Sequence, residues 1–450
     1  MKIKKVKWNN HPILGNLELD FVNQSTGVPF DTILFAGENG TGKTTILESI
    51  STFLNRGSFE YFESIEYIVN RRLYTATPLP DRNIQDFYIM TDDTGTQIEM
   101  RSNKNNSPES IDNNPLDIRH YGCVFSKARA DYRTSKITST TTKSLDLEKY
   151  DIDQEDDFTS SKQLIVDIQN QDNTEYADIN KSLGTSPKPW ADFYLTSKIY
   201  RFKNAFDDFF EQIKYEKVID IDSGKEILFK KNDKDISIDK LSTGEKQIVF
   251  RGIYLLKNSR NLDGAAIMID EPELSMHPKW QKKSLKYYKD LFTESNIQKA
   301  QLFIATHSDH VLNEALGDQA KNIVIILNEV SGAISAKKID APSVLPSITS
   351  AETNYLAFDI TSNDYHIELY GWLQEKESKT SVKSCDDFIK NHLLYDSTIH
   401  SKSSSFNRTT YDTISTYIRN AIHHPDSSRR YTESELRTST ELLRDLCGRL

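Results

Sequence analysis

One stretch of the sequence decides the fold: "TILFAGENGTGKTTILESISTFL", from Thr32 to Leu54. Its first residues are apolar enough for a buried strand, and its last part has the apolar spacing of a helix. Between them, Gly37 to Thr44 satisfy the pattern of Gly, four residues and Gly-Lys-Thr. Glycines in this pattern let backbone N–H groups close around phosphates, and the helix start adds positive potential. The stretch therefore predicts a phosphate loop between a strand and a helix.

The same loop suggests individual roles. Lys43 is expected to reach the β- and γ-phosphates of a nucleotide, and the Thr44 hydroxyl is expected to hold Mg²⁺. The loop residues expected to contact the nucleotide are Gly37, Asn39, Gly40, Gly42, Lys43, Thr44 and Thr45. The pattern predicts ATP and Mg²⁺ as cofactors.

A second stretch, "AAIMIDEPE" from Ala265 to Glu273, is an apolar strand that ends in acids. Read alone, it fits a strand leaving the core. Beside a phosphate loop, Asp270 is placed to share the Mg²⁺ with Thr44, and Glu271 is placed to polarise the attacking water. Together the two stretches favour ATP hydrolysis, with Glu271 as the catalytic carboxylate.

Three further stretches resemble motifs of ABC-type ATPases. "LSTGEKQ", Leu241 to Gln247, resembles their signature, and "FIATHSDHVL" resembles the strand and switch histidine, here His307. "ELSMHP", Glu273 to Pro278, resembles the loop that crosses their dimer interface and is called the crossing loop below. The motif order covers roughly the first 340 residues. The residues of these motifs, "IDEPELSMHP" and "ATHSDHVL", are most similar to the RecF, structural-maintenance-of-chromosomes and overcoming-lysogenisation-defect branch.

This resemblance implies a dimer. In such ATPases Ser242 and Gly244, with Glu245 beside them, contact the γ-phosphate bound by the other subunit, so ATP is sandwiched between two chains. His307 is implied to sense the γ-phosphate and orient the water, as a second catalytic residue. A homodimer or higher oligomer is therefore expected. The family also has a glutamine near the Mg²⁺, and three residues fit that position equally well: Gln85, Gln97 and Gln163.

The predicted fold class is α/β: an ABC-type P-loop ATPase with a mixed-sheet core and a helical insertion, followed by a small all-α domain. The ATPase domain is expected over residues 1–340, with the insertion at about 100–235, a linker over 341–353 and the C-terminal helical domain over 354–450. Alternating patterns predict strand pairs over 2–21 and 86–102. Within the insertion, Ile199, Phe202, Phe206 and Phe210 have helical spacing and are expected in the core.

The C-terminal stretch "TYIRNAIHHPDSSRR", Thr416 to Arg430, has two interpretations. It resembles the motif of HEPN ribonucleases, which implies Arg419 and His424 as catalytic residues, with Glu368 as an acid from an earlier helix; that family cuts RNA without metal. Alternatively it is a cationic helix end or a docking surface, stopped by a proline. On a continuous helix His423, not His424, shares a face with Arg419. Both interpretations stay open.

Composition excludes several classes. A net charge of −10 over 450 residues excludes a uniformly basic nucleic-acid binder, although a local basic patch remains compatible. Three cysteines at unrelated spacings build neither a disulfide framework nor a zinc site. The chain lacks a signal peptide and an apolar run of about 18 residues, so we expect a cytoplasmic protein that does not span a membrane.

The resemblance extends to anti-phage defence ATPases: the PtuA component of Septu and retron systems, and PrrC-like anticodon nucleases. It implies an ATPase that gates a nuclease effector, either a partner nuclease of the HNH type or its own C-terminal ribonuclease acting on RNA or tRNA. The alternative is a RecF-like ATPase of DNA repair or chromosome structure. Net acidity and the missing heptads argue mildly against that alternative. The residues of the motifs and the large insertion between Thr44 and Leu241 argue against a transporter subunit.

Overall fold

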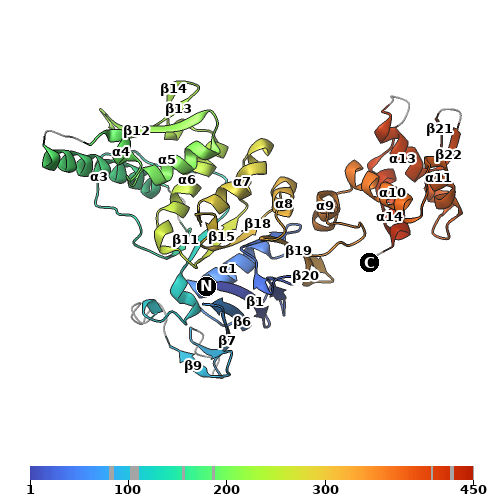
Figure 1. The fold of residues 1–450 in the computed structure, drawn as a ribbon, viewed down its shortest axis with the longest axis horizontal. Helices are drawn as coiled ribbons and strands as arrows, with labels where there is room; N and C mark the ends of the chain where they lie inside the picture. The colour runs from blue at the N-terminus through green and yellow to red at the C-terminus, as the bar shows by residue number, and fades with distance from the viewer. Residues whose placement is uncertain are drawn as a thin grey trace.

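A seven-stranded sheet forms the centre of the ATPase part (Figure 1). The computed structural model describes residues 1–80, 86–101, 111–154, 158–184, 188–406, 409–425 and 430–448. In spatial order the strands are β11 (Tyr150–Ile152), β10 (Cys123–Ser126), β15 (Ala266–Asp270), β18 (Gln301–Ala305), β5 (Thr32–Ala36), β19 (Asn322–Val330) and β20 (Ala333–Ile339). Neighbours from β11 to β19 run parallel, and β20 pairs antiparallel at the edge. The mixed sheet confirms the predicted α/β class.

Both faces of this sheet are buried, which explains why its strands are apolar without alternation. Along β5, Ile33 and Phe35 join one core with α1 (Lys43–Leu54), while Leu34 and Ala36 join the core of the helical layer on the other face. Because parallel strands share a direction, the carboxyl ends of β5, β15 and β18 lie at one edge. The phosphate loop, the acids and His307 follow these three ends in the sequence.

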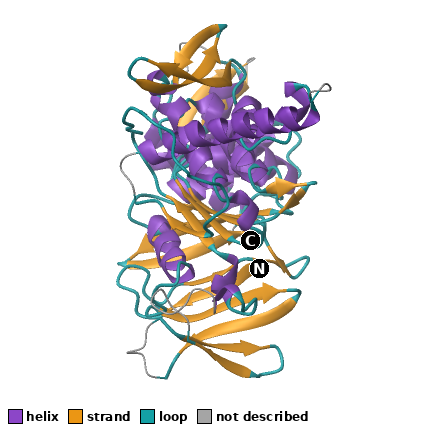
Figure 2. Cartoon of the chain, turned by 90° about the vertical axis from the view of Figure 1, so that its left-hand side faces the viewer, coloured by secondary structure: helices purple, strands orange, loops and turns teal. Residues whose placement is uncertain are grey.

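An antiparallel six-stranded sheet shares its core with α1 and the central sheet. The predicted strand pairs over 2–21 and 86–102 are confirmed as β1–β2 and β8–β9. In spatial order the strands are β2 (Glu18–Asp20), β1 (Lys2–Trp8), β6 (Phe62–Val69), β7 (Arg72–Pro78), β8 (Tyr88–Asp92) and β9 (Gln97–Met100). Figure 2 shows this sheet as the layer below the central sheet, with the helices on the opposite side.

The helical layer combines the insertion with helices of the ATPase core. Its helices are α3 (Thr159–Leu183), α4 (Trp190–Tyr194), α5 (Tyr200–Phe209), α6 (Thr243–Leu256), α7 (Pro278–Asp290) and α8 (Asp309–Leu316). A three-stranded sheet packs on it, formed by β12 (Ile213–Ile221), β13 (Gly224–Lys231) and β14 (Lys234–Ser237). The apolar stripe predicted for the core is buried, from Ile199 to Phe210.

The boundaries of the insertion differ from the prediction. β10 and β11 fall within the range 100–235 but pair inside the central sheet, so they belong to the ATPase core. The helical part starts only at α3, and the range ends in the three-stranded sheet. Parallel strands pair with segments far away in the sequence, so a local pattern does not reveal which sheet a short strand such as β10 joins.

The predicted linker is packed, and it joins two cores. Val344 and Leu345 are buried in the core of the C-terminal part. The following helix, α9 (Ser350–Phe358), contributes Ala351 to that core and Ala357 to the core of the ATPase part. Figure 1 shows α9 between α8 and the C-terminal helices. The two parts are therefore connected through a shared helix.

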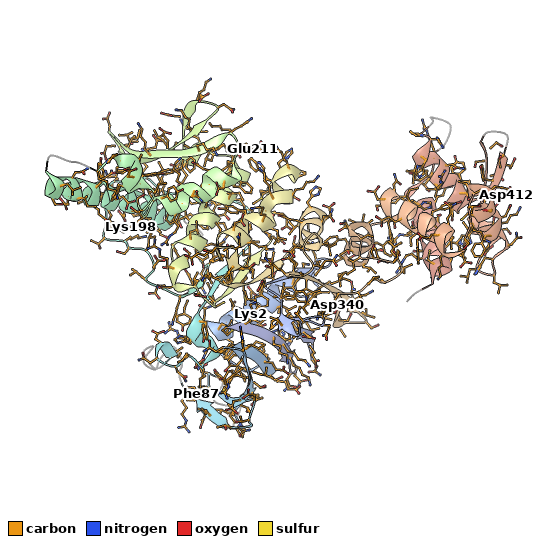
Figure 3. The ribbon with its side chains drawn as sticks, viewed as in Figure 1. Lys2, Phe87, Lys198, Glu211, Asp340 and Asp412 are labelled. Atoms are coloured by element: carbon orange, nitrogen blue, oxygen red, sulfur yellow. The ribbon has the colours of Figure 1, made fainter. Side chains whose placement is uncertain are left out.

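The C-terminal part is mainly helical, as predicted. Its helices are α10 (Asn363–Lys376), α11 (Val382–Asn391), α12 (Ser397–His400), α13 (Ile414–His423) and α14 (Glu433–Cys447). A capping box of Thr432 and Glu435 starts α14. One element was missed: the hairpin of β21 (Ser401–Phe406) and β22 (Thr409–Thr413). In Figure 3 Asp412 lies in this part, and Asp340 lies near its junction with the ATPase part.

Short elements complete the described chain. They are the pairs β3 (Val22–Asn23) with β4 (Val28–Pro29) and β16 (Thr293–Glu294) with β17 (Ile297–Gln298), and the 3-10 turns Ile118–Tyr121, Ile238–Lys240 and Ser259–Asn261. Among the residues described, none of the helices combines the length and apolar character needed to cross a membrane.

Candidate active site

The phosphate loop connects β5 to α1 and depends on its glycines. Gly37 has φ +145°, and a Cβ there would lie 2.3 Å from the carbonyl oxygen of Leu327. Gly42 has φ +85°, and a Cβ there would lie 2.7 Å from Leu14. Both positions therefore need glycine for conformation and for space. Leu14 belongs to the turn between β1 and β2, so this N-terminal turn supports the loop, a role that no motif indicated.

Lys43 points back into the phosphate loop. Its Nζ donates to the carbonyl oxygens of Gly37 at 2.8 Å and Glu38 at 2.7 Å. Burial lowers the pKa of Lys43 to about 8, although Glu271 and Asp270 nearby favour its charged form. A cation held among carbonyl oxygens at a helix start provides positive charge where phosphates bind.

Thr44 and Asp270 meet as predicted. The Thr44 hydroxyl lies 3.1 and 3.0 Å from the two carboxyl oxygens of Asp270, to which it donates. Burial raises the pKa of Asp270 to about 6, against the Thr44 hydrogen bond, which lowers it. The structure thus places a hydroxyl and a carboxylate side by side, the oxygen ligands that Mg²⁺ prefers.

Glu271 and His307 face each other across this point. His307 Nε2 lies 3.6 Å from Glu271 Oε1. The pKa of His307 is lowered, first by burial and then by the Lys43 charge, which favours a neutral ring. Glu271 itself has φ +44°, a backbone conformation that costs free energy in a non-glycine residue. Such strain is typical of functional positions held by their surroundings.

Glu273 is a residue of this site whose role the sequence did not reveal. It is 8% exposed, and its Oε1 accepts hydrogen bonds from the Thr306 hydroxyl at 2.8 Å and from the His307 backbone N–H at 2.7 Å. Burial raises its pKa. Glu273 is the first residue of the crossing loop, so its side chain connects this loop to the backbone of His307.

Arg251 is a second such residue. It lies on α6 and is 1% exposed, and its guanidinium donates to three carbonyl oxygens: Asp270 at 3.0 Å, Glu271 at 3.2 Å and Lys127 at 2.6 Å. These bonds fix the strained backbone at Glu271. The one signal in the sequence was a charged residue inside the apolar run "IVFRGIYLL", which is unusual for a buried helix.

The signature residues stand at the start of α6. Ser242 caps the helix in a capping box with Glu245, which also lies 2.6 Å from Lys231 Nζ. Ser242 is exposed, whereas Gly244 is buried against the crossing loop, since a Cβ on it would lie 2.8 Å from the Ser275 carbonyl oxygen. No described contact joins Ser242 or Gly244 to the phosphate loop of the same chain.

The remaining predicted nucleotide contacts are placed on the surface of the loop. Asn39 and Gly40 are exposed at its tip, and Thr45 is half-buried in the first turn of α1. Of the three glutamine candidates, Gln97 lies on β9 in the other sheet, and Gln163 bonds Ser139 and Asp167 near the start of α3. Gln85 lies outside the described residues. Neither described glutamine has a recorded contact with Thr44 or Asp270.

Comparison with known proteins identifies the family. A model of the family described as "AAA domain, putative AbiEii toxin, Type IV TA system" matches residues 33–313, more than half of the chain. The chain belongs to this family. The matched range contains the phosphate loop, the acids after β15, the signature and His307. Membership of this AAA family supports ATPase activity at the site described.

One curated relative matches part of this AAA family member. The "Retron Vc95 probable ATPase" of Vibrio cholerae serotype O1 biovar El Tor is 36% identical over 109 residues. The match covers 22% of this chain and 20% of the relative, so the chain spans about a fifth of that protein's length.

Solved structures similar to the AAA family member include two heads of structural-maintenance-of-chromosomes proteins. The SMC head domain from Thermotoga maritima is 13% identical at a TM-score of 0.38, covering 75% of this chain and 99% of that one. The Smc head with an extended coiled coil bound to the C-terminal domain of ScpA, derived from Pyrococcus furiosus, has the same identity and TM-score, covering 75% and 96%.

The residues of the AAA site fit a nucleotide and Mg²⁺. Gly37 and Gly42 leave no room for side chains, which keeps backbone N–H groups accessible, and Lys43 adds positive charge. Thr44 and Asp270 offer two oxygen ligands for the ion. When bound, ATP supplies the phosphoanhydride bond and Mg²⁺ neutralises phosphate charge. Within the described residues there is no cluster of three or more His, Cys, Asp or Glu that suits a metal held by protein side chains alone.

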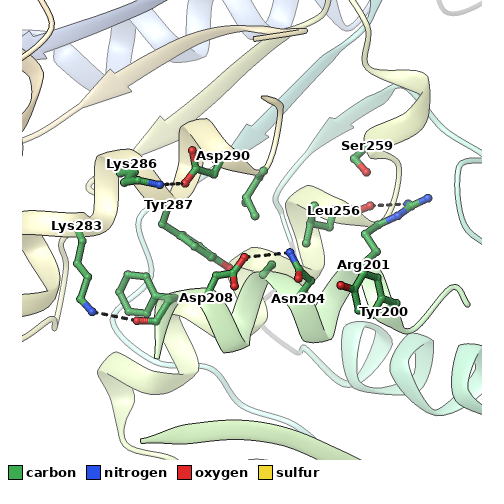
Figure 4. Close-up of a pocket in the computed structure, with 13 residues that line it drawn as sticks. Tyr200, Arg201, Asn204, Asp208, Leu256, Ser259, Lys283, Lys286, Tyr287 and Asp290 are labelled. Carbon is green, nitrogen blue, oxygen red and sulfur yellow. Dashed lines mark hydrogen bonds and ion pairs between the residues drawn. The ribbon is translucent and has the colours of Figure 1, made fainter. Parts of the chain in front are cut away.

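A cavity of about 480 Å³ lies apart from this site, between α5, α6 and α7 (Figure 4). Its charged groups are already paired: Asn204 donates to Asp208 at 3.0 Å, Lys286 bonds Asp290, and Arg201 bonds Asp146 outside the cavity. Because these groups already have protein partners, the cavity is the joint between the insertion and the ATPase core.

The predicted ribonuclease residues of the C-terminal part are not all brought together. Arg419 donates to the Asn420 side chain at 3.0 Å, and His424 follows the last residue of α13, with its N–H donating to the Asn420 carbonyl. Glu368 instead accepts from the Thr349 hydroxyl at 2.7 Å, and no described contact joins it to Arg419. The reason is helix geometry: Tyr370 bonds Thr416 on α13, and Glu368, two residues earlier, points away from that side.

Proposed function

We propose that this protein is the ATP-hydrolysing subunit of an anti-phage defence system, and that it dimerises on ATP and gates a nuclease. One observation carries the proposal: Lys43, Thr44, Asp270, Glu271 and His307 converge where β5, β15 and β18 end. These residues come from three separate motifs: the phosphate loop, the acids after β15 and the histidine after β18. The fold is what brings the three motifs together.

The side chains divide the chemistry of ATP hydrolysis among them. Glu271 is placed to accept a hydrogen bond from the attacking water and to polarise it. His307, with its lowered pKa, offers a neutral ring nitrogen 3.6 Å from the Glu271 carboxylate, where it is placed to orient the same water. Lys43 provides fixed positive charge for the phosphates, and Thr44 with Asp270 holds the ion.

The signature supports a dimer. Ser242 is exposed at the start of α6, a helix long enough to present several free N–H groups and a positive end. In this proposal that helix start binds the γ-phosphate held by a second copy of the chain. Beside Ser242, Gly244 packs against the crossing loop, which follows the acids directly in the sequence. A second copy that docks at Ser242 therefore lies close to Asp270 and Glu271.

The defence role rests on relatives. The family description names the AbiEii toxin, and the partial match is to a retron ATPase. We place the nuclease in a partner protein, of the HNH type that accompanies PtuA-like ATPases, because Glu368 bonds Thr349 and does not complete a ribonuclease set with Arg419. The C-terminal part then serves as the docking or sensing element.

The first experiment measures phosphate release from ATP by the purified chain with Mg²⁺. Glu271→Gln should lower kcat by at least about a hundredfold, since it removes the general base. Glu329→Gln, an exposed carboxylate at the end of β19, is the matched control and should equal the wild type. Wild-type and Glu271→Gln proteins with equal rates would refute the assignment of the site.

The second experiment asks where the nuclease lies. Total tRNA is incubated with the chain, ATP and Mg²⁺, beside His424→Ala and Arg419→Ala. Intact RNA in every reaction agrees with a partner nuclease. Cleavage that disappears in His424→Ala would place the nuclease in the C-terminal part and overturn the partner version. A parallel reaction with double-stranded DNA tests the RecF-like alternative, which predicts DNA-stimulated ATP hydrolysis.

A further inference from the structure

Two helices of the helical layer start beside the catalytic site. α7 begins at Pro278, the last residue of the crossing loop, and α8 begins directly after His307 and its neighbour Ser308. Whatever moves the crossing loop therefore moves the start of α7, and whatever moves α8 moves His307. The contacts between the two helices decide whether these movements are linked.

Gln281 bridges the two helix starts with a single side-chain amide. Its Nε2 donates to the Met276 carbonyl oxygen in the crossing loop at 3.0 Å. Its Oε1 accepts from the hydroxyl of Ser308, the residue after His307, at 2.7 Å. Ser308 and Met276 are both buried, at 6% exposure each, so water competes little for these bonds. The Gln281 side chain thus connects the crossing loop to the residue next to His307.

A second contact holds the helices in parallel register. Glu314, in the last turn of α8, accepts hydrogen bonds from the backbone N–H groups of Leu285 at 3.1 Å and Lys286 at 2.9 Å. Burial raises the pKa of this carboxyl to about 7. With Gln281 at one end and Glu314 at the other, α7 and α8 are joined by hydrogen bonds at two points.

The crossing loop is also linked to the signature and to His307 directly. Gly244 packs on the Ser275 carbonyl, and Glu273 binds the His307 N–H. The path runs from the signature through Ser275 and Met276 to Gln281, Ser308 and His307. Each step is a close contact, a peptide bond or a hydrogen bond.

We infer that Gln281 is a positioning residue for ATP hydrolysis: it sets the place of His307 according to the place of the crossing loop, and so makes hydrolysis depend on docking of the second copy of the chain. The inference deepens the proposed function and rests on it, since it presumes an ATP site completed by a second copy. Gln281 touches neither Glu271 nor His307 side chains in the described contacts, so it acts through Ser308 and the backbone.

The test separates positioning from stability. Gln281→Leu keeps the volume and loses both hydrogen bonds; we expect kcat for ATP to fall about tenfold to a hundredfold, with KM changed less than about twofold, as for a misplaced catalytic group. Ser308→Ala should give a similar loss, and the double variant should be no worse than either single one, because the two side chains form one bridge. Ser308→Thr keeps the hydroxyl and should retain the wild-type kcat.

The control is Lys282→Leu, which changes the next, exposed residue of α7 and should leave kcat unchanged. Thermal unfolding of each variant is measured alongside. A wild-type kcat in Gln281→Leu would overturn the inference, and so would additive losses in the double variant or a loss matched by a rise in KM. If the wild-type chain hydrolyses no ATP, the proposed function fails; if it does and Gln281→Leu equals it, the inference alone fails.

Discussion

The residues that matter most at this site are constrained by backbone conformation as much as by chemistry. Glu271 has a positive φ, and three phosphate-loop glycines do as well. Arg251 supports the strained carboxylate from α6 through two carbonyl oxygens. Because strain at a single residue costs about 1–3 kcal/mol, it persists only where neighbours hold it in place.

Gly37 and Gly40 should respond differently to alanine. A Cβ on Gly37 would lie 2.3 Å from a backbone oxygen of β19, so Gly37→Ala must displace the loop and should abolish nucleotide binding. Gly40 has φ +86° but nothing within 4 Å, so Gly40→Ala costs only the left-handed conformation, about 1–2 kcal/mol. Titration with a fluorescent ATP analogue measures both. Equal affinities of the two variants would contradict the steric argument.

His366 should make the C-terminal part sensitive to acid. It is fully buried, its Nε2 lies 2.9 Å from the Ser439 hydroxyl, and burial lowers its pKa to about 3 from 6.5. Between these values the unfolded chain binds a proton that the folded chain does not, so the free energy of unfolding falls as pH drops below 6.5. The slope reaches about 1.4 kcal/mol per pH unit.

Urea unfolding at several pH values between 7 and 4, monitored by the fluorescence of the C-terminal part, measures this pH dependence. His366→Gln removes the titration and should flatten the dependence, whereas His424→Gln, at an exposed position, should leave it unchanged. An equally steep dependence in His366→Gln would assign the acid sensitivity to other groups.

At the scale of elements, helix contacts explain positions that local propensity misjudges. Gly252 lies inside α6, where glycine is unfavourable, yet a Cβ there would lie 2.4 Å from the Tyr287 hydroxyl and 3.0 Å from Phe206. That hydroxyl donates to the Ile248 carbonyl at 3.3 Å, so α5, α6 and α7 meet at this residue. The glycine is required by packing.

Gly252→Ala should therefore destabilise the protein, while Gly371→Ala should stabilise it. At Gly252 overpacking costs about 1–3 kcal/mol, more than the roughly 1 kcal/mol that helix propensity returns. Gly371 is exposed on α10 with nothing within 4 Å, so there the propensity gain of about 1 kcal/mol stands alone. Denaturant midpoints of the two variants should shift in opposite directions; shifts of the same sign would contradict the packing argument.

At the scale of the whole molecule, two parts share the helix α9. Glu352 on that helix is 3% exposed and accepts from the Val344 N–H at 3.1 Å and the Tyr365 hydroxyl at 3.2 Å, while the other end of α9 packs beside α8. A change at the ATP site that moves α8 thus has a direct packed route to the C-terminal part (Figure 1).

The assembly should depend on ATP. With ATP and Mg²⁺, Glu271→Gln should accumulate as a dimer, because nucleotide is bound and not hydrolysed. Adding Ser242→Arg should return it to monomers, because the large side chain blocks the start of α6 where the second copy's phosphate would bind. Sedimentation velocity with and without ATP measures this. A mass that ignores both ATP and Ser242→Arg would refute the sandwich dimer.

The sequence by itself determined the features that are local. The phosphate loop, the acids after an apolar strand, the hairpins around β1 and β8 and the capping box of α14 each depend on residues within a few positions of one another, and such patterns have one stable local solution. The pairing of Thr44 with Asp270, 226 positions apart, could be foreseen for another reason: both motifs imply a ligand of the same Mg²⁺.

Only the tertiary structure decided what depends on distant contacts. It placed β10 in the central sheet, buried the expected linker in the core of the C-terminal part, where it leads into a helix shared by two cores, and set Glu368 against Thr349. Gln281 and Arg251 lie outside the motifs, and the motifs that contain Glu273 give it no role, because these roles depend on Ser308, Lys127 and His307, partners 27 to 124 positions away that packing brings within hydrogen-bond range. A residue's type limits which bonds it forms, but the fold chooses its partners.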